Sequence, residues 1–98
     1  MNEPRKYRKL PVEVEAMQFD GTPESATAII NWVLSHGGRA RWVCVDSPCF
    51  GDAPHVLQID TLEGTMTATA MSHVIRGVKD EFYPCQPDIF NTTYEVVS

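Results

Sequence analysis

Cys85 and His73 are the one nucleophile and base that this sequence offers as a catalytic pair. They lie within residues 73–90, a stretch dense in aromatic, charged and proline residues that is typical of a β-hairpin followed by a turn into a short helix. The predicted hairpin places Val74, and not His73, opposite Cys85. The thiol and the imidazole are therefore expected on opposite faces. Since no nucleophile-elbow, phosphate-loop or zincin pattern occurs either, we expect a protein that is not an enzyme.

The same hairpin predicts a polar patch. Lys79-Asp80 is expected as its two-residue connection, because Asp tolerates the positive φ of such turns. In that register Arg76 faces Tyr83, and alternation places Arg76, Glu81 and Tyr83 together on one face. A cation, a carboxylate and a phenol could recognise a ligand. The alternative is a solvated sheet face with a weak cross-strand ion pair.

The three cysteines, Cys44, Cys49 and Cys85, are an odd number and follow no signal peptide, which argues against a disulfide framework. Cys44 and Cys49 are separated by four residues, which is wider than a zinc knuckle, although His55 and His73 could complete a metal site. Buried, inert thiols are the favoured interpretation. We therefore predict no metal ligand and no cofactor.

The length and composition of the chain predict a single α+β domain over residues 1–98 that positions these groups. Of these residues, 43% are hydrophobic. About five mostly antiparallel strands are expected to pack on one amphipathic helix, with a short C-terminal helix beginning at Pro87-Asp88. The expected strands cover residues 11–19 and 40–46, a hairpin over 55–70 that turns at Glu63-Gly64, and the hairpin after residue 73.

The main helix is predicted over residues 23–36, from a Thr22 cap to Gly37-Gly38. Its apolar stripe is made of Ala26, Ile29, Ile30, Val33 and Leu34. Trp32 lies off this stripe, so it either caps the edge of the core or faces a partner.

Three further apolar features bear on the fold and on contacts. Trp42 belongs to the strand over residues 40–46, and Phe50 lies in the long loop that follows, either tucked under it or exposed as a contact. Along residues 11–19 the apolar face switches near Ala16-Met17. A β-bulge would explain the switch, and so would a second covered face.

Charge narrows the range of partners. The net charge is −5, which argues against a surface that wraps nucleic acid. Residues 1–10 nevertheless form a basic lead-in with four of the eight basic residues, Arg5, Lys6, Arg8 and Lys9, beside Tyr7. No apolar run approaches the about 20 residues of a membrane span, and no signal peptide is recognisable. A cytoplasmic protein is expected.

Several stretches resemble a family of small proteins from tailed bacteriophages and prophages. The similar stretches run from Lys6 to Gly21, Thr61 to Gly64, Ile75 to Phe90 and Thr93 to Glu95, with the motifs Lys-Tyr-Arg-Lys-x-Pro-Val and Gly-Val-Lys-x-Glu-Phe-Tyr-Pro-Cys-x-Pro-Asp-Ile-Phe. The Pro-Gly-Asp-Tyr-Gly motif that labels the family is absent, since Ala70-Met71-Ser72 stands there and Asp80 replaces the usual Gly of the next hairpin. The resemblance implies a phage origin, expression in an infected host cell and a compact α+β fold. It implies no reaction.

We therefore expect a small phage accessory protein that acts as a non-enzymatic protein-interaction module. Its partner would be an unidentified host or phage protein, and it could also form a homodimer. The candidate binding residues are Arg76, Glu81, Tyr83, Trp32, Trp42 and Phe50. One alternative is a protein that sequesters a nucleotide or other small ligand through Arg76, Tyr83 and Trp42. The other is a weak nucleic-acid binder that uses the basic lead-in.

Overall fold

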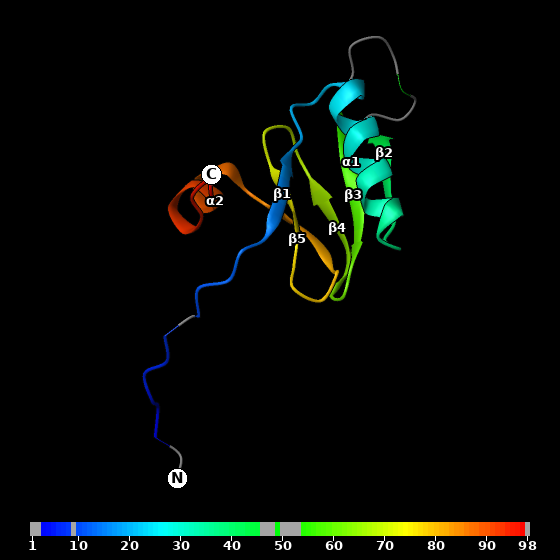
Figure 1. Ribbon diagram of the computed structural model, residues 1–98. Coiled ribbons are helices and arrows are strands. Elements are labelled where there is room, and N and C mark those ends of the chain that lie inside the picture. Colours follow the sequence, from blue (N-terminus) through cyan, green and yellow to red (C-terminus); the bar gives the residue numbers. More distant parts are fainter. Residues whose placement is uncertain (1–2, 9, 46–48, 50–53, 98) are drawn as a thin grey trace.

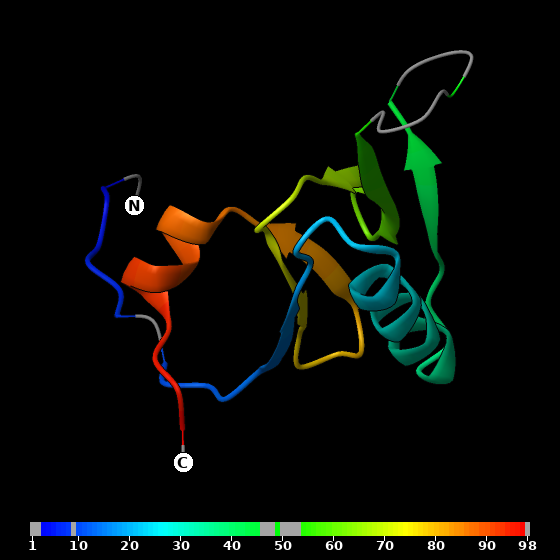
Figure 2. The ribbon, with the colours of Figure 1, turned by 90° about the horizontal axis from the view of Figure 1, so that it is seen from above.

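The computed structural model describes residues 3–8, 10–45, 49 and 54–97. In this part of the chain two three-stranded antiparallel sheets pack with two helices (Figures 1 and 2). The first sheet has the order β1-β5-β6 and the second the order β2-β3-β4. The strands are β1 (Glu15–Gln18), β2 (Ala40–Cys44), β3 (His55–Thr61), β4 (Gly64–Ala68), β5 (His73–Arg76) and β6 (Phe82–Cys85).

The predicted α+β class and the antiparallel pairing agree with the structure, but five strands packed on one helix is wrong. The connection after β4 explains the division into two sheets. Met71 has φ 73°, and its N–H donates to the carbonyl of Phe19 while the N–H of Phe19 donates to Ser72. These bonds turn the chain away from β4 and pair β5 with β1.

Helix α1 (Pro23–Ser35) agrees with the prediction over 23–36. The hydroxyl of Thr22 accepts a hydrogen bond from the Ser25 N–H at 3.2 Å, which caps the start of the helix. At the other end Gly37 has φ 81°, and the N–H of Gly38 donates to the Val33 carbonyl. This Schellman arrangement satisfies the last carbonyls and ends the helix.

The hydrophobic core lies between α1 and the two sheets. Its buried members are Phe19, Ala26, Ile29, Val33, Leu57, Ile59, Ala68, Val74 and Phe82. Trp32 packs edge-to-face on Phe82 with 5.1 Å between ring centroids, so it caps the edge of the core. Leu34, which the predicted stripe placed in the core, is exposed.

The β3–β4 hairpin keeps its predicted faces, although its turn lies one residue earlier. Thr61 pairs with Gly64 around the two-residue connection Leu62-Glu63. Moving a two-residue turn by one position shifts the pairing by two residues, so every side chain keeps its face. Leu57 and Ala68 accordingly share the buried face, as predicted, although the predicted turn would have paired Leu57 with Ala70.

The β5–β6 hairpin differs from the prediction by one residue of register. Its connection is a five-residue loop over residues 77–81, closed by a 2.7 Å hydrogen bond from the Gly77 N–H to the Glu81 carbonyl. Arg76 therefore pairs with Phe82, and Ile75 pairs with Tyr83. A shift of one residue moves side chains to the opposite face. It therefore changes both the predicted polar patch and the predicted placement of Cys85 and His73 on opposite faces.

The first sheet is covered on both faces. Met17, Val74 and Phe82 face the main core, whereas Ile75 is fully buried on the other face. That face is covered by helix α2 (Pro87–Thr93), which lies on the side of the sheet away from α1 (Figure 2). The switch of the apolar face at Ala16-Met17 therefore reflects a strand covered on both sides.

Helix α2 begins at Pro87, as predicted. Gln86 is the N-cap residue and makes no side-chain capping bond, while Asp88 lies in the first turn. Residues 3–8 extend away from the domain (Figure 1). Within the described residues, neither helix has the length and apolar character needed to cross a membrane.

Candidate functional site

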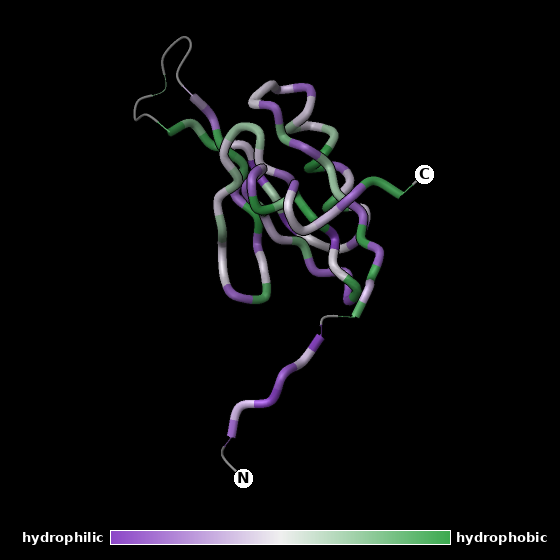
Figure 3. Tube along the Cα trace, turned by 90° about the vertical axis from the view of Figure 1, so that its left-hand side faces the viewer, coloured by the Kyte–Doolittle hydropathy of each residue, from purple (hydrophilic) through white to green (hydrophobic). Residues whose placement is uncertain are grey.

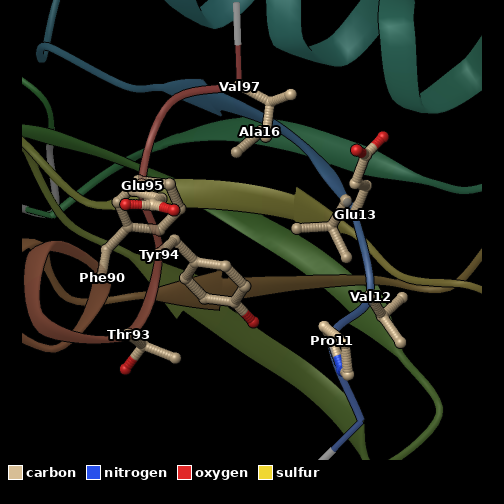
Figure 4. A pocket seen from close by; sticks show the side chains of 10 residues that line it. Pro11, Val12, Glu13, Ala16, Phe90, Thr93, Tyr94, Glu95 and Val97 are labelled. Atoms are coloured by element: carbon tan, nitrogen blue, oxygen red, sulfur yellow. The ribbon is translucent and has the colours of Figure 1, made fainter.

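The outer face of the first sheet carries a groove. A pocket of about 400 Å³ lies between the segment before β1 and the segment that includes α2 and the residues after it (Figure 4). A second pocket of about 200 Å³ shares Val12, Val14 and Tyr94 with it and extends to Gly77. We call these two pockets together the α2 groove. Its lining residues are Leu10, Pro11, Val12, Glu13, Val14, Ala16, Gly77, Val78, Glu81, Tyr83, Phe90, Thr93, Tyr94, Glu95 and Val97.

Aromatic rings hold the groove in place. The ring of Phe90 stacks on the imidazole of His73 on one side and contacts the ring of Tyr94 on the other, with centroids 3.7 and 5.0 Å away. The backbone N–H of Tyr94 donates to the Phe90 carbonyl at 2.9 Å. Figure 4 shows Tyr94 between Phe90 and the residues that precede β1. The groove thus has a flat apolar wall anchored to β5.

Tyr83 contributes a neutral phenol to the groove. Burial first, then its hydrogen bond to Tyr94 and the nearby charge of Glu81, raise the pKa of Tyr83 to about 12. The phenol therefore stays protonated at neutral pH and can only take part in hydrogen bonds and apolar contacts. It offers no nucleophile or base there.

The charged residues that line the groove are acidic. Glu13 and Glu95 line the larger pocket and Glu81 lines the smaller one, and among the described residues no Lys or Arg lines either pocket. Carboxylates at the rim of an apolar surface raise the local concentration of cationic groups and repel phosphates. An occupant that combines positive charge with aromatic or aliphatic side chains would fit this groove.

The predicted patch of Arg76, Glu81 and Tyr83 is wrong as a unit. Arg76 lies on the opposite face from Tyr83, because the register differs by one residue. Its guanidinium contacts Glu15 at 2.6 Å and Asp80 at 2.5 Å, and these two carboxylates raise the pKa of Arg76. Glu81 and Tyr83 remain together in the groove, whereas Arg76 is occupied by ion pairs.

The other predicted contact residues do not join this site. Trp32 lies against Phe82 at the core edge. Trp42 belongs to the second sheet, where its ring is edge-to-face with His55 at 4.8 Å. Phe50 lies outside the described residues. Of the five candidates that the structure describes, it brings together Glu81 and Tyr83 in the groove.

Cys85 and His73 are cross-strand partners, so the expectation that they lie on opposite faces is wrong. Their electrostatics nevertheless oppose nucleophilic chemistry. Burial raises the pKa of Cys85, helped by the charge of Asp88, while burial lowers the pKa of His73. A reactive pair needs a thiolate beside a protonated imidazole, and both shifts favour the neutral forms instead.

Cys44 and Cys49 also differ from the prediction of buried, inert thiols. They form a disulfide, with their Cα atoms 5.9 Å apart, and Cys49 is exposed. His55 joins this cluster, in which the ligand atoms all lie within 4.8 Å of one another. His73, the other histidine considered for a metal site, belongs to the first sheet.

The groove residues that the sequence did not single out for binding come from both ends of the chain. Val12, Glu13, Phe90, Tyr94 and Glu95 meet only through packing of the termini on β5. The switch of the apolar face near Ala16 was the available signal, because it indicated a second covered surface on the first strand.

Comparisons with models of protein families, with characterised proteins and with solved structures found no match for this chain. The phage resemblance therefore rests on the sequence motifs alone.

Proposed function

We propose that this chain is a non-enzymatic protein-interaction module of bacteriophage origin, which binds an extended basic segment of a protein in the α2 groove. The acidic, aromatic lining of the groove carries this proposal. The motifs that resemble those of phage proteins support the origin. The raised pKa of Cys85 beside the lowered pKa of His73 supports a role without covalent chemistry.

The occupant we propose is the N-terminal arm, residues 3–8, of a second copy. Residues 1–10 hold four of the eight basic residues and one of the thirteen acidic ones, so the rest of the chain is strongly acidic. The arm is exposed, and Tyr7 retains 88% of its full accessibility. Figure 3 shows the arm as largely hydrophilic and well separated from the folded part of the chain.

Continuity of the chain favours exchange between two copies. The arm precedes residues 10–14, which form one wall of the groove. In a two-fold dimer each arm would leave its own groove and enter that of the partner, so that the same surface serves both copies. Arginine over Tyr94 adds a cation–π contact, and the rim carboxylates neutralise the arm.

The other two functions considered have less support. Nucleotide binding through Arg76, Tyr83 and Trp42 would need side chains that lie on different faces and different sheets. Nucleic-acid binding would need cations around the arm, whereas the charged residues that line the groove beside it are acidic.

Sedimentation velocity on the full chain tests the proposal. The expected result is a concentration-dependent dimer at about 0.1 M salt that dissociates towards about 1 M, as the screening length falls from about 10 to about 3 Å. Reversing the arm charges with R5E, K6E and R8E should give a monomer. Reversing the charges at the groove rim with E13K and E95K should also give a monomer. Combining both sets of substitutions should restore the dimer.

The matched control is Glu63→Lys, which reverses an exposed charge on the β3–β4 turn and should leave the dimer unchanged. A monomeric wild type, indistinguishable from the arm variant, would rule out self-association. Affinity capture from bacterial lysate would then compare wild type with the E13K/E95K variant. If no stoichiometric partner is lost from the variant, the groove is not a protein-binding site.

A further inference from the structure

We propose that Cys44, Cys49 and His55 form a metal site for a zinc-class divalent cation once the Cys44–Cys49 disulfide is reduced. The site is separate from the α2 groove and lies at one end of the second sheet. Its ligand set, two thiolates and one imidazole, is the set that Zn²⁺ prefers in proteins.

The β2–β3 pairing fixes two of the ligands. Cys44 ends β2 and His55 begins β3, and the two are direct cross-strand partners. Residues directly opposite in an antiparallel pair project their side chains to the same face. Cys49 comes from the connection between these strands, and its Cα lies 5.9 Å from that of Cys44. The hairpin thus gathers three ligands from twelve consecutive positions, 44–55.

The distances suit tetrahedral coordination. Zinc bonds of about 2.3 Å to sulfur and about 2.0 Å to nitrogen imply, at tetrahedral angles, an S···N separation of about 3.5 Å. The Sγ of Cys49 lies 3.6 Å from Nε2 of His55. The two sulfurs must separate to about 3.8 Å, which cleavage of their bond permits. Little movement of His55 is needed.

The surroundings also fit a metal site. The ring of Trp42 packs edge-to-face on His55 with centroids 4.8 Å apart, and so restricts the orientation of the imidazole. Cys49 is exposed, which gives an ion access. Among the described residues three ligands converge. A tetrahedral site has a fourth position, which none of the described residues fills and which water commonly occupies.

Reduction of the disulfide and binding of the metal are two separate steps, and the electrons and protons balance in each. A dithiol reductant supplies two electrons and two protons to the Cys44–Cys49 bond and becomes a disulfide itself, leaving two thiols. Binding of Zn²⁺ then releases both thiol protons to solvent, while His55 coordinates through a neutral ring nitrogen. The redox state of the pair therefore decides whether the site can hold metal.

The test is a Co²⁺ and Zn²⁺ titration of the full chain. The protein is first reduced with a phosphine, which is oxidised to its oxide with oxygen from water and leaves no competing thiol. Reduced wild type should bind one Co²⁺ with thiolate charge-transfer bands and tetrahedral d–d bands, and Zn²⁺ should displace it. Calorimetry in buffers of different ionisation enthalpy should show release of about two protons.

Matched variants distinguish this site from general thiol or histidine binding. Cys44→Ser, Cys49→Ser and His55→Gln should each weaken Zn²⁺ binding by more than the about 10- to 100-fold typical of losing an outer partner. Cys85→Ser and His73→Gln, which change the same residue types elsewhere, should leave it unchanged. Cys49→Ser alters an exposed residue and so tests the ligand without disturbing the core.

Three outcomes with the reduced protein would overturn the proposal. They are equal Zn²⁺ affinity of reduced wild type and Cys49→Ser, absence of the tetrahedral Co²⁺ spectrum, and loss of binding in Cys85→Ser with binding retained in Cys44→Ser. Oxidised wild type should not bind, and binding of equal strength before and after reduction would also contradict it.

Discussion

The imidazole of His73 on β5 stacks face to face on the phenyl ring of Phe90 on α2, with centroids 3.7 Å apart and 6° between the ring planes. This contact joins the C-terminal helix to the middle strand of the first sheet. Because Phe90 in turn supports Tyr94, the stack positions the wall of the α2 groove. Groove geometry and helix docking therefore depend on the same pair.

Phe90→Ala should release α2 from the sheet. Since Phe90 is half-buried, we expect the free energy of unfolding to fall by about 1–3 kcal/mol, less than the loss at a fully buried phenylalanine. Ile89→Ala is the control on the same helix. Because Ile89 is 53% exposed, this substitution should lower the free energy of unfolding by less than about 0.5 kcal/mol. Urea unfolding of both variants measures the difference. Equal losses would mean that the stack does not hold the helix.

Burial of His73 makes stability depend on pH. Desolvation lowers the pKa of His73 in the folded state below its ordinary value of 6.5. Between those two pKa values the unfolded chain binds more protons, so stability should decrease as the pH falls through 6.5 and level off below the folded pKa. Protonation of Asp20, whose pKa is lowered to about 2, acts only at much lower pH.

His73→Phe isolates this dependence, because it keeps an aromatic ring on Phe90 and removes the titrating nitrogens. It also removes Nδ1, which is buried and has no hydrogen-bond partner in the described part of the chain. We expect the variant to be at least as stable as wild type at neutral pH, and its stability to decline less between pH 7 and 5. Denaturant melts across that range measure both, and a curve parallel to that of wild type would contradict the assignment.

Thr22→Ala should destabilise α1 through its first turn. The Thr22 hydroxyl accepts from the Ser25 N–H at 3.2 Å, and its loss at an N-cap typically costs about 1 kcal/mol. Thr22→Ser retains the hydroxyl and should stay within about 0.5 kcal/mol of wild type. Thermal unfolding of the two variants compares them directly, and a Ser variant as unstable as the Ala variant would exclude capping as the cause.

Elements whose ends and faces depend on residues close together in the sequence could be predicted. Helix α1 was predicted well because Thr22, Pro23 and Gly37 determine its ends within a few residues. The β3–β4 faces were predictable because both arms alternate in polarity, and the actual error of register preserved that alternation.

The β5–β6 register could not be predicted in the same way. Val74 and Ile75 are both buried, since the sheet is covered on both faces, so alternation gave no information about the pairing. Lys79-Asp80 had the composition of a two-residue turn, whereas the Gly77 to Glu81 backbone bond forms a longer loop. Because the predicted register was wrong, the predicted patch was wrong too. Of its three residues, only Glu81 and Tyr83 line the groove.

Asp80 offers a test of that longer loop. Its φ of 60° was anticipated from its residue type, and its carboxylate contacts Arg76. Asp80→Ala and Asp80→Gly both remove the carboxylate, but only Ala is strained at positive φ, by about 1 kcal/mol. We therefore expect the Ala variant to unfold at lower urea concentration than the Gly variant. Asp80→Asn keeps a residue that tolerates this φ. Any loss of stability in that variant should therefore come from the broken ion pair with Arg76, and the difference from wild type should disappear at high salt. Equal stability of the Ala and Gly variants would mean that residue 80 does not adopt the left-handed conformation.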